Sequence, residues 1–312
     1  MTPGAEGMHM GSTVIRCEQL TKYYGKSRGI EDLTFEVRPG QVYGFLGPNG
    51  AGKTTTIRCL LSMLRPTSGA AYLFDEKVGI DGRELRRRIG YVSGDASFFE
   101  KQTGRWMLDY ISGLRGGSGP AERELCERLE FDPSRRVREL SKGNKQKLAL
   151  IIALMHVPEL LMLDEPTSGL DPLNQQVVFD ILEERVAEGA TVFLSSHILP
   201  EVERVCERVA IIRGGKVVAE ESVSELLSKA IRTVNVTYSE PVADEFVKGL
   251  AGVMSVERVG ENGLTAKVSE DIGGALQGFL GRPVADITVE HASLEEVFLQ
   301  YYGHGEEGGG HS

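Results

Sequence analysis

Short apolar runs recur along the first two thirds of the chain, separated by stretches with helical periodicity. A continuous apolar run of four to six residues is typical of a parallel strand that is covered on both faces. The runs span 42–46, 89–92, 160–163, 191–194 and 209–213. The expected helices span 106–114, 121–129, 144–155 and 174–188. Strands that alternate with helices predict an α/β layered core.

The pattern changes near residue 220, where a helical connector from Glu220 to Ile231 is expected. After it, alternation predicts strands at 233–238, 253–259, 264–268 and 284–289, and periodicity predicts helices at 242–250 and 272–280. Ser293 and Glu296 form a capping box that opens a last helix ending at Tyr302. We therefore expect a large domain at 13–228 and a small α+β domain at 229–302, between a disordered leader, 1–12, and a disordered tail, 303–312.

Composition narrows the function classes. The chain has 312 residues, a net charge of −10 and a pI of about 5.3, which argues against broad nucleic-acid binding. Its four cysteines are scattered and form no C-x-x-C pair, so neither a zinc site nor a disulfide framework is expected. No apolar run approaches the roughly 18–20 residues of a membrane span, and the leader lacks the apolar core of a signal peptide. A membrane role would have to come through a partner.

The clearest chemical signal follows the strand expected at 42–46. It fits G-x-x-x-x-G-K-[ST] and consists of Gly47, Pro48, Asn49, Gly50, Ala51, Gly52, Lys53 and Thr54. The glycines allow backbone N–H groups to surround an anion, and the next helix directs its positive dipole end at the same point. Lys53 would reach the β- and γ-phosphates, and the Thr54 hydroxyl would bind Mg²⁺. The alternative is a chance Gly-rich turn, which the strand–loop–helix context disfavours.

Two carboxylates, Asp164 and Glu165, follow the apolar run that ends at Leu163. Beside a phosphate loop, Asp164 would support Mg²⁺ through water, and Glu165 would polarise the attacking water as a general base. Without that loop, two surface acids at a strand end would be the better interpretation. Ser141, at the start of the helix that ends at Met155, is either a plain N-cap or part of a second anion site.

The order of these motifs resembles the nucleotide-binding subunit of an ABC transporter, over roughly residues 14–227. The resemblance implies a P-loop NTPase core with a helical subdomain at about 95–155, bound ATP and Mg²⁺, and ATP hydrolysis. It also implies roles for the site residues: Tyr24 stacks on adenine, the stretch from Gly47 to Thr54 and Thr55 is Walker A, and Asp164 and Glu165 end Walker B. Ser141 and Gly143 belong to the signature, which binds the γ-phosphate held by the other subunit. Asp171 belongs to the D-loop, and His197 is the switch histidine that contacts the γ-phosphate.

Two positions depart from the family pattern. Gly94 stands where the family's Q-loop glutamine is expected, and glycine has no side chain to bind Mg²⁺ or to sense the γ-phosphate. Asp95 is a candidate substitute. Lys142 replaces the second residue of the signature, normally glycine, and could add positive charge near the phosphates.

The C-terminal pattern, together with the stretch 292–299, resembles the extension of bacterial drug- and antibiotic-exporter ATPases of the daunorubicin-resistance type. A generic appendage that aids dimerisation is the alternative. The resemblance implies the ATPase half of an exporter, cytoplasmic and peripheral on the inner face of the membrane. Its partners would be a polytopic permease and a second copy of the chain, with no nucleic acid. Phe98, Phe99, Thr103 and Trp106 are candidates for the permease surface, or else form ordinary subdomain core.

Two other functions remain open. One is a non-transport ABC ATPase that works on ribosomes or DNA, which the single Walker A, the absence of a heptad run and the acidic charge disfavour. The other is a regulatory subunit with altered coupling, for which Gly94 is the motive.

Overall fold

The structure, a computed structural model, describes residues 13–79, 83–117, 119–228, 231–268, 272–290, 293–295 and 297–298. It divides into two compact units, one up to Glu220 and one from Glu221. The expected disordered leader and tail, and half of the last helix expected from Ser293 to Tyr302, lie outside the described residues. Within the part of the chain that is described, none of the helices has both the length and the apolar character needed to span a bilayer.

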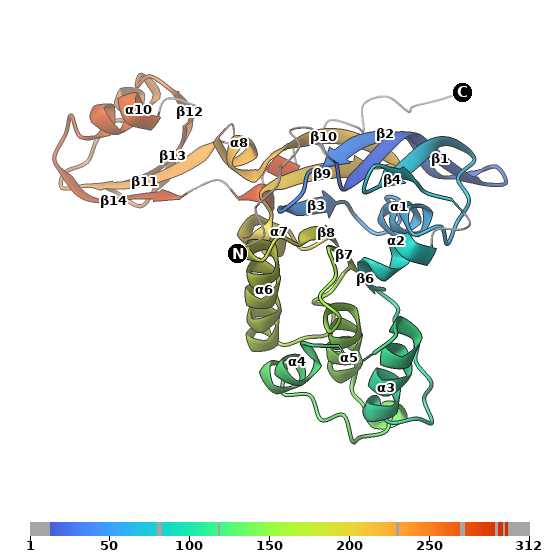
Figure 1. The fold of residues 1–312 in the computed structure, drawn as a ribbon. Coiled ribbons are helices and arrows are strands. Elements are labelled where there is room, and N and C mark those ends of the chain that lie inside the picture. Colours follow the sequence, from blue (N-terminus) through green and yellow to red (C-terminus); the bar gives the residue numbers. More distant parts are fainter. Residues whose placement is uncertain are drawn as a thin grey trace, which may run out of the picture. The chain divides into compact units, whose positions relative to one another are not determined.

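A six-stranded sheet in the order β10-β9-β3-β8-β7-β6 forms the centre of the first unit (Figure 1). Its strands are β3 (Val42–Leu46), β6 (Ile89–Val92), β7 (Leu160–Asp164), β8 (Thr191–Ser196), β9 (Arg208–Arg213) and β10 (Lys216–Ser222). The pairs β9 with β3, β3 with β8, β8 with β7 and β7 with β6 are all parallel. Their carboxyl ends therefore lie at one edge, the edge where ligands bind in such sheets.

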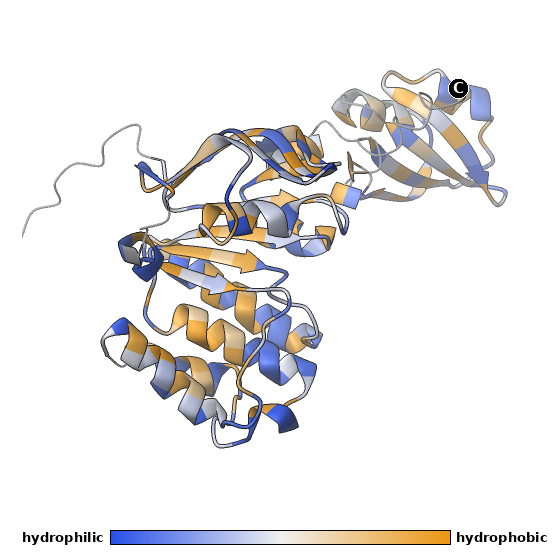
Figure 2. Cartoon of the chain, turned by 90° about the vertical axis from the view of Figure 1, so that its right-hand side faces the viewer, coloured by the Kyte–Doolittle hydropathy of each residue, from blue (hydrophilic) through white to orange (hydrophobic). Residues whose placement is uncertain are grey.

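A second, antiparallel sheet in the order β2-β1-β4-β5 packs on the first. It contains β1 (Ile15–Tyr24), β2 (Ser27–Val37), β4 (Ser68–Leu73) and β5 (Glu76–Lys77). Four buried aromatic rings join the two sheets: Phe35 of β2, Tyr43 and Phe45 of β3, and Phe193 of β8, with neighbouring ring centroids 5.3–6.0 Å apart. This packing fixes β3, and with it the loop that follows β3. In Figure 2 the strands of the central sheet are coloured largely as hydrophobic.

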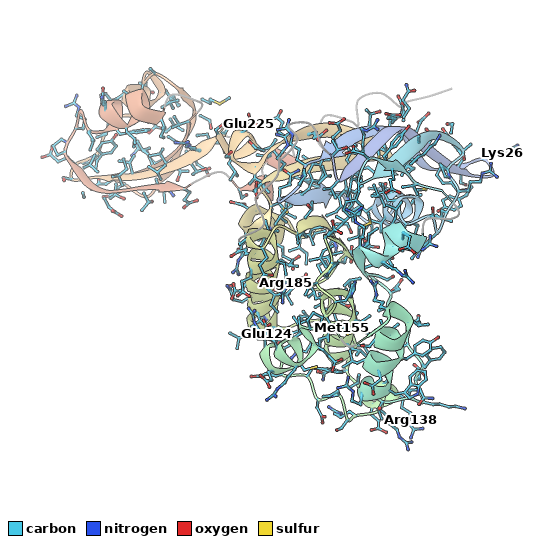
Figure 3. All side chains as sticks on the ribbon, viewed as in Figure 1. Lys26, Glu124, Arg138, Met155, Arg185 and Glu225 are labelled. Carbon is cyan, nitrogen blue, oxygen red and sulfur yellow. The ribbon has the colours of Figure 1, made fainter. Side chains whose placement is uncertain are left out.

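The helices of the first unit are α1 (Lys53–Leu60), α2 (Arg83–Arg87), α3 (Gly104–Arg115), α4 (Glu122–Arg128), α5 (Lys142–Leu154), α6 (Pro172–Ala187), α7 (Leu199–Val205) and the 3₁₀ turn η1 (Val137–Glu139). Helices α3, α4 and α5 group together in Figure 1, within the stretch expected as a helical subdomain. Helix α4 contacts α6 through ion pairs: Arg128 with Glu184, and Arg185 with Glu124 at 3.9 Å (Figure 3).

The second unit has a βαββαβ order with the sheet β12-β13-β11-β14, a ferredoxin-like arrangement. Its elements are β11 (Arg232–Tyr238), α9 (Asp244–Lys248), β12 (Val253–Val259), β13 (Gly263–Val268), α10 (Ile272–Phe279) and β14 (Val284–Glu290), preceded by α8 (Val223–Ser228). Strands β12 and β13 form the expected antiparallel hairpin. A buried cluster that includes Val236, Tyr238, Val247 and Phe279 gives this unit its own core.

Two expectations about the elements need correction. The connector expected to be helical from Glu220 begins as a strand, because β10 continues to Ser222 beside β9 before α8 starts. Strands β4 and β5 were not expected. The β4 sequence is rich in small residues and does not alternate, and its antiparallel pairing with β1, from Ser68 to Leu73, makes it a strand.

Candidate nucleotide site

The phosphate loop joins the buried end of β3 to α1. Gly50 and Gly52 have φ angles of +80° and +115°, in the region that favours glycine. A Cβ at Gly52 would come within 2.6 Å of the Ile30 side chain, so sterics also require glycine there. Gly52 is the N-cap of α1 and has no side chain to cap it, so the first N–H groups of the helix remain available to an anion.

Lys53 is buried, with 5% of its surface exposed. Its ammonium donates to the carbonyl oxygens of Gly47 at 2.6 Å and Pro48 at 3.2 Å, and lies 3.9 Å from Glu165 Oε1. Burial lowers the pKa of Lys53, while the charges of Glu165 and Asp164 oppose that shift. An ammonium held in this way can donate to phosphate oxygens in place of these carbonyl oxygens.

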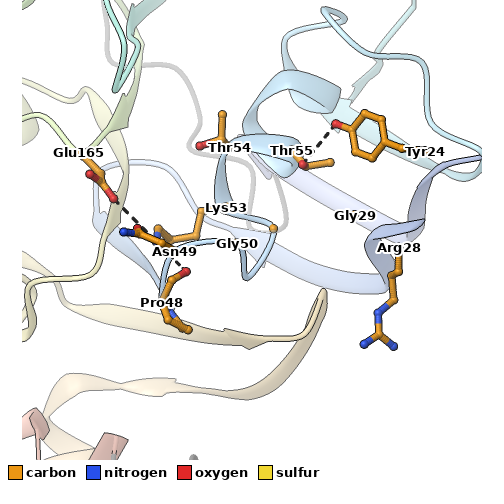
Figure 4. A pocket seen from close by; sticks show the side chains of 11 residues that line it. Tyr24, Arg28, Gly29, Pro48, Asn49, Gly50, Lys53, Thr54, Thr55 and Glu165 are labelled. Atoms are coloured by element: carbon orange, nitrogen blue, oxygen red, sulfur yellow. Dashed lines mark hydrogen bonds and ion pairs between the residues drawn. The ribbon is translucent and has the colours of Figure 1, made fainter. Parts of the chain in front are cut away.

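A cavity of about 290 Å³ opens over this loop (Figure 4). Its lining consists of Tyr24, Arg28, Gly29, Pro48, Asn49, Gly50, Gly52, Lys53, Thr54, Thr55 and Glu165. Tyr24 is 48% exposed, and its hydroxyl lies 3.4 Å from Thr55 Oγ1. The cavity therefore has an aromatic wall next to a ring of N–H and hydroxyl donors, which suits a nucleotide base with its phosphates.

Sequence reasoning missed Arg28 and Gly29 in this lining. A Cβ at Gly29 would lie 2.8 Å from the Tyr24 ring, so the glycine lets the ring lie close to β2. An isolated glycine within a strand is a known signal of close approach and could have identified this position.

Thr54 and Asp164 meet where the metal was expected. Thr54 Oγ1 donates to Asp164 Oδ2 at 2.7 Å, and the Ser195 hydroxyl donates to the other carboxylate oxygen. Oxygen donors of this kind suit Mg²⁺, which usually takes one or two carboxylates together with substrate phosphates and water. Among the described residues, no group of three or more His, Cys, Asp or Glu side chains could hold a metal ion.

Glu165 and His197 lie together beside the cavity. His197 Nδ1 is 2.8 Å from Glu165 Oε1, and the Glu165 N–H donates to the Ser195 carbonyl at 3.0 Å. Glu165 has a φ of +52°, a backbone conformation that is strained for a residue other than glycine. Strain of this kind gathers at functional sites.

Gly94 lies beside the candidate metal ligand. A Cβ at Gly94 would be 3.5 Å from the Asp164 carbonyl oxygen and 3.8 Å from its carboxylate. These are ordinary contact distances, so a side chain at this position would point into the metal region. Asp95 is exposed. These distances are compatible with the expected Q-loop position of Gly94, where the glutamine is absent.

The expected signature and D-loop residues lie apart from this cavity. Ser141 caps α5 by accepting from the Asn144 N–H at 3.2 Å, and Asp171 caps α6 by accepting from the Asn174 N–H at 3.0 Å. The Asn174 N–H, followed by its side-chain amide, lowers the pKa of Asp171. The cavity lining does not include four of the predicted site residues that lie outside the phosphate loop: Ser141, Gly143, Asp171 and His197. It also does not include Gly47, Ala51 and Asp164, and the last two are buried.

Two buried polar groups near Glu165 escaped the sequence analysis. Gln146, on α5, donates to the Pro166 carbonyl at 2.8 Å. Glu201 accepts from Thr167 at 2.7 Å and from Ser196 at 3.2 Å. Burial raises the pKa of Glu201, and these hydrogen bonds oppose the shift. Both side chains stabilise loops at the carboxyl edge of the sheet. In the sequence each is a single polar residue within a helix, and no motif identifies it as part of a site.

Comparisons with known proteins agree with this geometry. The family model described as ABC transporter matches residues 30–168. The bacitracin transport ATP-binding protein BcrA of Bacillus licheniformis is 40% identical over 216 residues, which are 67% of this chain and 70% of that protein. The daunorubicin/doxorubicin resistance ATP-binding protein DrrA of Streptomyces peucetius is 33% identical over 312 residues, covering 93% of this chain and 92% of that protein.

Solved structures match about two thirds of the chain. The structure of an ATP-binding subunit of an ABC transporter matches with a TM-score of 0.64 and 30% identity, over 69% of this chain and 92% of that one. At the level of fold alone, a dimeric post-hydrolysis ATP-binding cassette, MJ0796, bound to ADP and Pi matches with a TM-score of 0.61 and 23% identity, over 67% of this chain and 98% of that one. With a phosphate loop, an acidic strand end and these relatives, the chain belongs to the ATP-binding subunits of ABC transporters.

Proposed function

We propose that this chain hydrolyses ATP by general-base catalysis from Glu165. The observation that carries the proposal is the placement of the Glu165 carboxylate, 2.8 Å from His197 and 3.9 Å from Lys53 at the wall of the phosphate cavity. Glu165 accepts a proton from the attacking water, Lys53 binds the β- and γ-phosphates, and His197 contacts the γ-phosphate. Tyr24 stacks on the adenine.

Mg²⁺ fits this site through Thr54 and Asp164. Their hydroxyl and carboxylate oxygens lie 2.7 Å apart at the start of α1, next to the phosphate position. Thr54 would bind the ion directly, and Asp164 would hold it through water. When bound, the ion neutralises the charge that develops on the phosphate oxygens.

The second half of the catalytic site comes from a second copy. Ser141, Gly143 and Asp171 lie outside the cavity lining of their own chain, which supports their use across a twofold interface. ATP then contacts both subunits and stabilises the closed dimer, and loss of the γ-phosphate releases it. The dimeric state of the MJ0796 cassette supports this assembly.

A polytopic permease is the proposed membrane partner. Phe99, Trp106 and Tyr110 form an exposed aromatic cluster at α3, with exposed fractions of 57%, 37% and 42%. Leu114, one turn further along, is 63% exposed. An apolar stripe of this kind supports docking by a permease helix more than it supports subdomain core. The names of the relatives support export of antibiotics or drugs, with this chain on the cytoplasmic face of the membrane.

The experiment is a pull-down of the chain carrying Glu165→Gln from membranes of its own host in Mg-ATP. Recovery of a polytopic membrane protein, and its loss with Trp106→Ala, supports the exporter and its docking surface. Recovery of ribosomes or DNA-repair factors would place the chain in the non-transport class instead. Absence of ATP turnover by the wild-type chain with its permease would contradict the enzymatic proposal.

Gly94 favours a second candidate, a subunit with altered coupling between ATP and the permease. The contact distances at Gly94 leave room for a side chain beside Asp164. We predict that Gly94→Gln changes the stimulation of ATPase activity by the permease by about 2- to 30-fold and leaves nucleotide affinity unchanged. Stimulated activity that appears only in Gly94→Gln would favour the regulatory candidate.

A further inference from the structure

The first turn of α5 contacts the turn that follows the Glu165 carboxylate. Gln146 Nε2 donates to the carbonyl oxygens of Pro166 at 2.8 Å and Glu165 at 3.4 Å. A Cβ at Gly143 would come within 2.7 Å of the Gly169 carbonyl oxygen, so the two backbones touch. The start of the signature helix and the end of Walker B are thus joined within one chain.

Lys142 adds a contact that the family's glycine could not make. Its ammonium donates to Ser168 Oγ at 3.0 Å. Its methylene groups lie along Gly169, where a Cβ would be 3.1 Å from the Lys142 Cγ and Cδ atoms, and Gly169 has a φ of +80°. The lysine chain therefore lies over the turn, with its charge at Ser168.

Ser168 is connected directly to Glu165. The Ser168 N–H donates to the Glu165 carbonyl at 3.2 Å, and the Glu165 N–H donates to the Ser195 carbonyl at 3.0 Å. These bonds hold Glu165 at its φ of +52°, a conformation that persists only when its surroundings enforce it. Lys142 reaches Glu165 through one residue, Ser168.

We propose that Lys142 is a positioning residue for hydrolysis: by holding Ser168, it keeps the Glu165 carboxylate directed at the attacking water. The inference rests on the proposed role of Glu165 as general base. It differs from the expectation that Lys142 supplies charge to the phosphates, because the ammonium contacts Ser168 of its own chain. Position 142 of the signature, where lysine replaces the family's glycine, would then act within its own subunit.

The test compares steady-state Mg-ATP hydrolysis by the full chain with its permease. Lys142→Met keeps the stem on Gly169 and the helix propensity while removing the hydrogen bond. We expect kcat to fall about tenfold with KM nearly unchanged, because a misplaced base affects the chemical step more than binding. Lys142→Arg should restore kcat, since it keeps a charged donor.

Ser168→Ala supplies a second, independent variant. It should lower kcat to a similar extent, and Lys142→Met/Ser168→Ala should be no worse than either single change. Lys145→Met, one turn along the same helix and paired at 3.5 Å with Glu100, is the matched control and should keep wild-type kcat.

Four results separate the possibilities. Two results would overturn the positioning role in favour of a contact between Lys142 and the phosphates. One is an additive loss of kcat in the double variant, and the other is a rise in KM in Lys142→Met that Ser168→Ala does not share. Wild-type kcat in Lys142→Met would also overturn it, while leaving the ATPase proposal intact. A wild-type chain without turnover would instead count against the proposed function itself.

Discussion

Helices α1 and α5 both begin at a loop expected to bind phosphate, yet their N-termini differ. Helix α1 starts after Gly52, has no side-chain cap and opens into the cavity. Helix α5 starts after Ser141, which accepts from the Asn144 N–H, and neither Ser141 nor Gly143 lines that cavity. An uncapped N-terminus can hold an anion within one subunit, as proposed for α1. A capped N-terminus outside the cavity fits the proposal that Ser141 and Gly143 contact a nucleotide held by a second copy.

Glu165→Gln should break hydrolysis while leaving both helix ends intact. A general base contributes about 10²–10⁴-fold, so we expect a loss of kcat in that range. ATP binding should persist, because Lys53 and the loop are unchanged, and the dimer should accumulate in the closed state. Single-turnover hydrolysis and size-exclusion chromatography in ATP measure these effects.

The exposed Glu183, on α6, provides a matched control. Glu183→Gln should retain wild-type turnover. Unchanged turnover in Glu165→Gln would contradict the general-base assignment. The difference between the N-termini of α1 and α5 would then have no link to hydrolysis at Glu165.

Lys53→Ala should damage the α1 site alone. Removing a charged donor to the phosphates weakens ATP binding by about 10–100-fold. Equilibrium titration with a fluorescent ATP analogue on the isolated chain measures it, with Lys145→Ala as the control. Normal affinity in Lys53→Ala would mean that the ammonium stays on the carbonyls of Gly47 and Pro48 when nucleotide binds.

Ser141→Ala should affect the N-terminus of α5 and leave the nucleotide site at the N-terminus of α1 intact. Nucleotide affinity of the isolated chain should stay at the wild-type value, because Ser141 does not line the cavity. Dimerisation driven by ATP, measured in the Glu165→Gln background, should be lost. The missing cap should also cost about 1 kcal/mol of unfolding free energy.

Thr103→Ala is the control for that cost, because Thr103 caps α3 by accepting from the Trp106 N–H at 3.2 Å. It should lose similar stability and still dimerise. Dimerisation lost equally in both variants would mean that Ser141 acts only through helix stability.

The smallest effect concerns the other end of α5. His156 follows that helix, and burial, with a further contribution from the charge of Arg115, lowers its pKa from 6.5 to about 4. The native state therefore binds this proton less readily than the unfolded state. Its contribution to stability is complete above about pH 6.5 and is lost as pH falls toward 4.

Urea unfolding at pH 7.5 and pH 5 measures this contribution, and His156→Gln should remove its part of the pH dependence. An unchanged pH dependence in His156→Gln would contradict the assignment. A loss of ATP-driven dimerisation over the same pH range, in parallel with stability, would show that the two ends of α5 are not independent.

Local pattern was sufficient for the central strands and the phosphate loop. The bounds 89–92 were predicted as observed for β6, because a strand covered on both faces is apolar throughout its length. The loop was predictable because its glycines and lysine interact with near neighbours, such as Gly47 and Pro48. By contrast, β4 depends on pairing with β1, about fifty residues away, and small residues give no local signal for it.

The sequence by itself determined which chemical groups the chain carries: a phosphate-loop motif, a carboxylate pair, a histidine and an acidic net charge. Only the tertiary structure decided which of these groups meet. The parallel sheet brings Glu165 to His197, and Thr54 to Asp164, because its strands end at one edge. The packing of α5 brings Lys142 to Ser168, 26 residues away in the sequence. The residues next to Lys142 and Ser168 in the sequence give no sign of this contact.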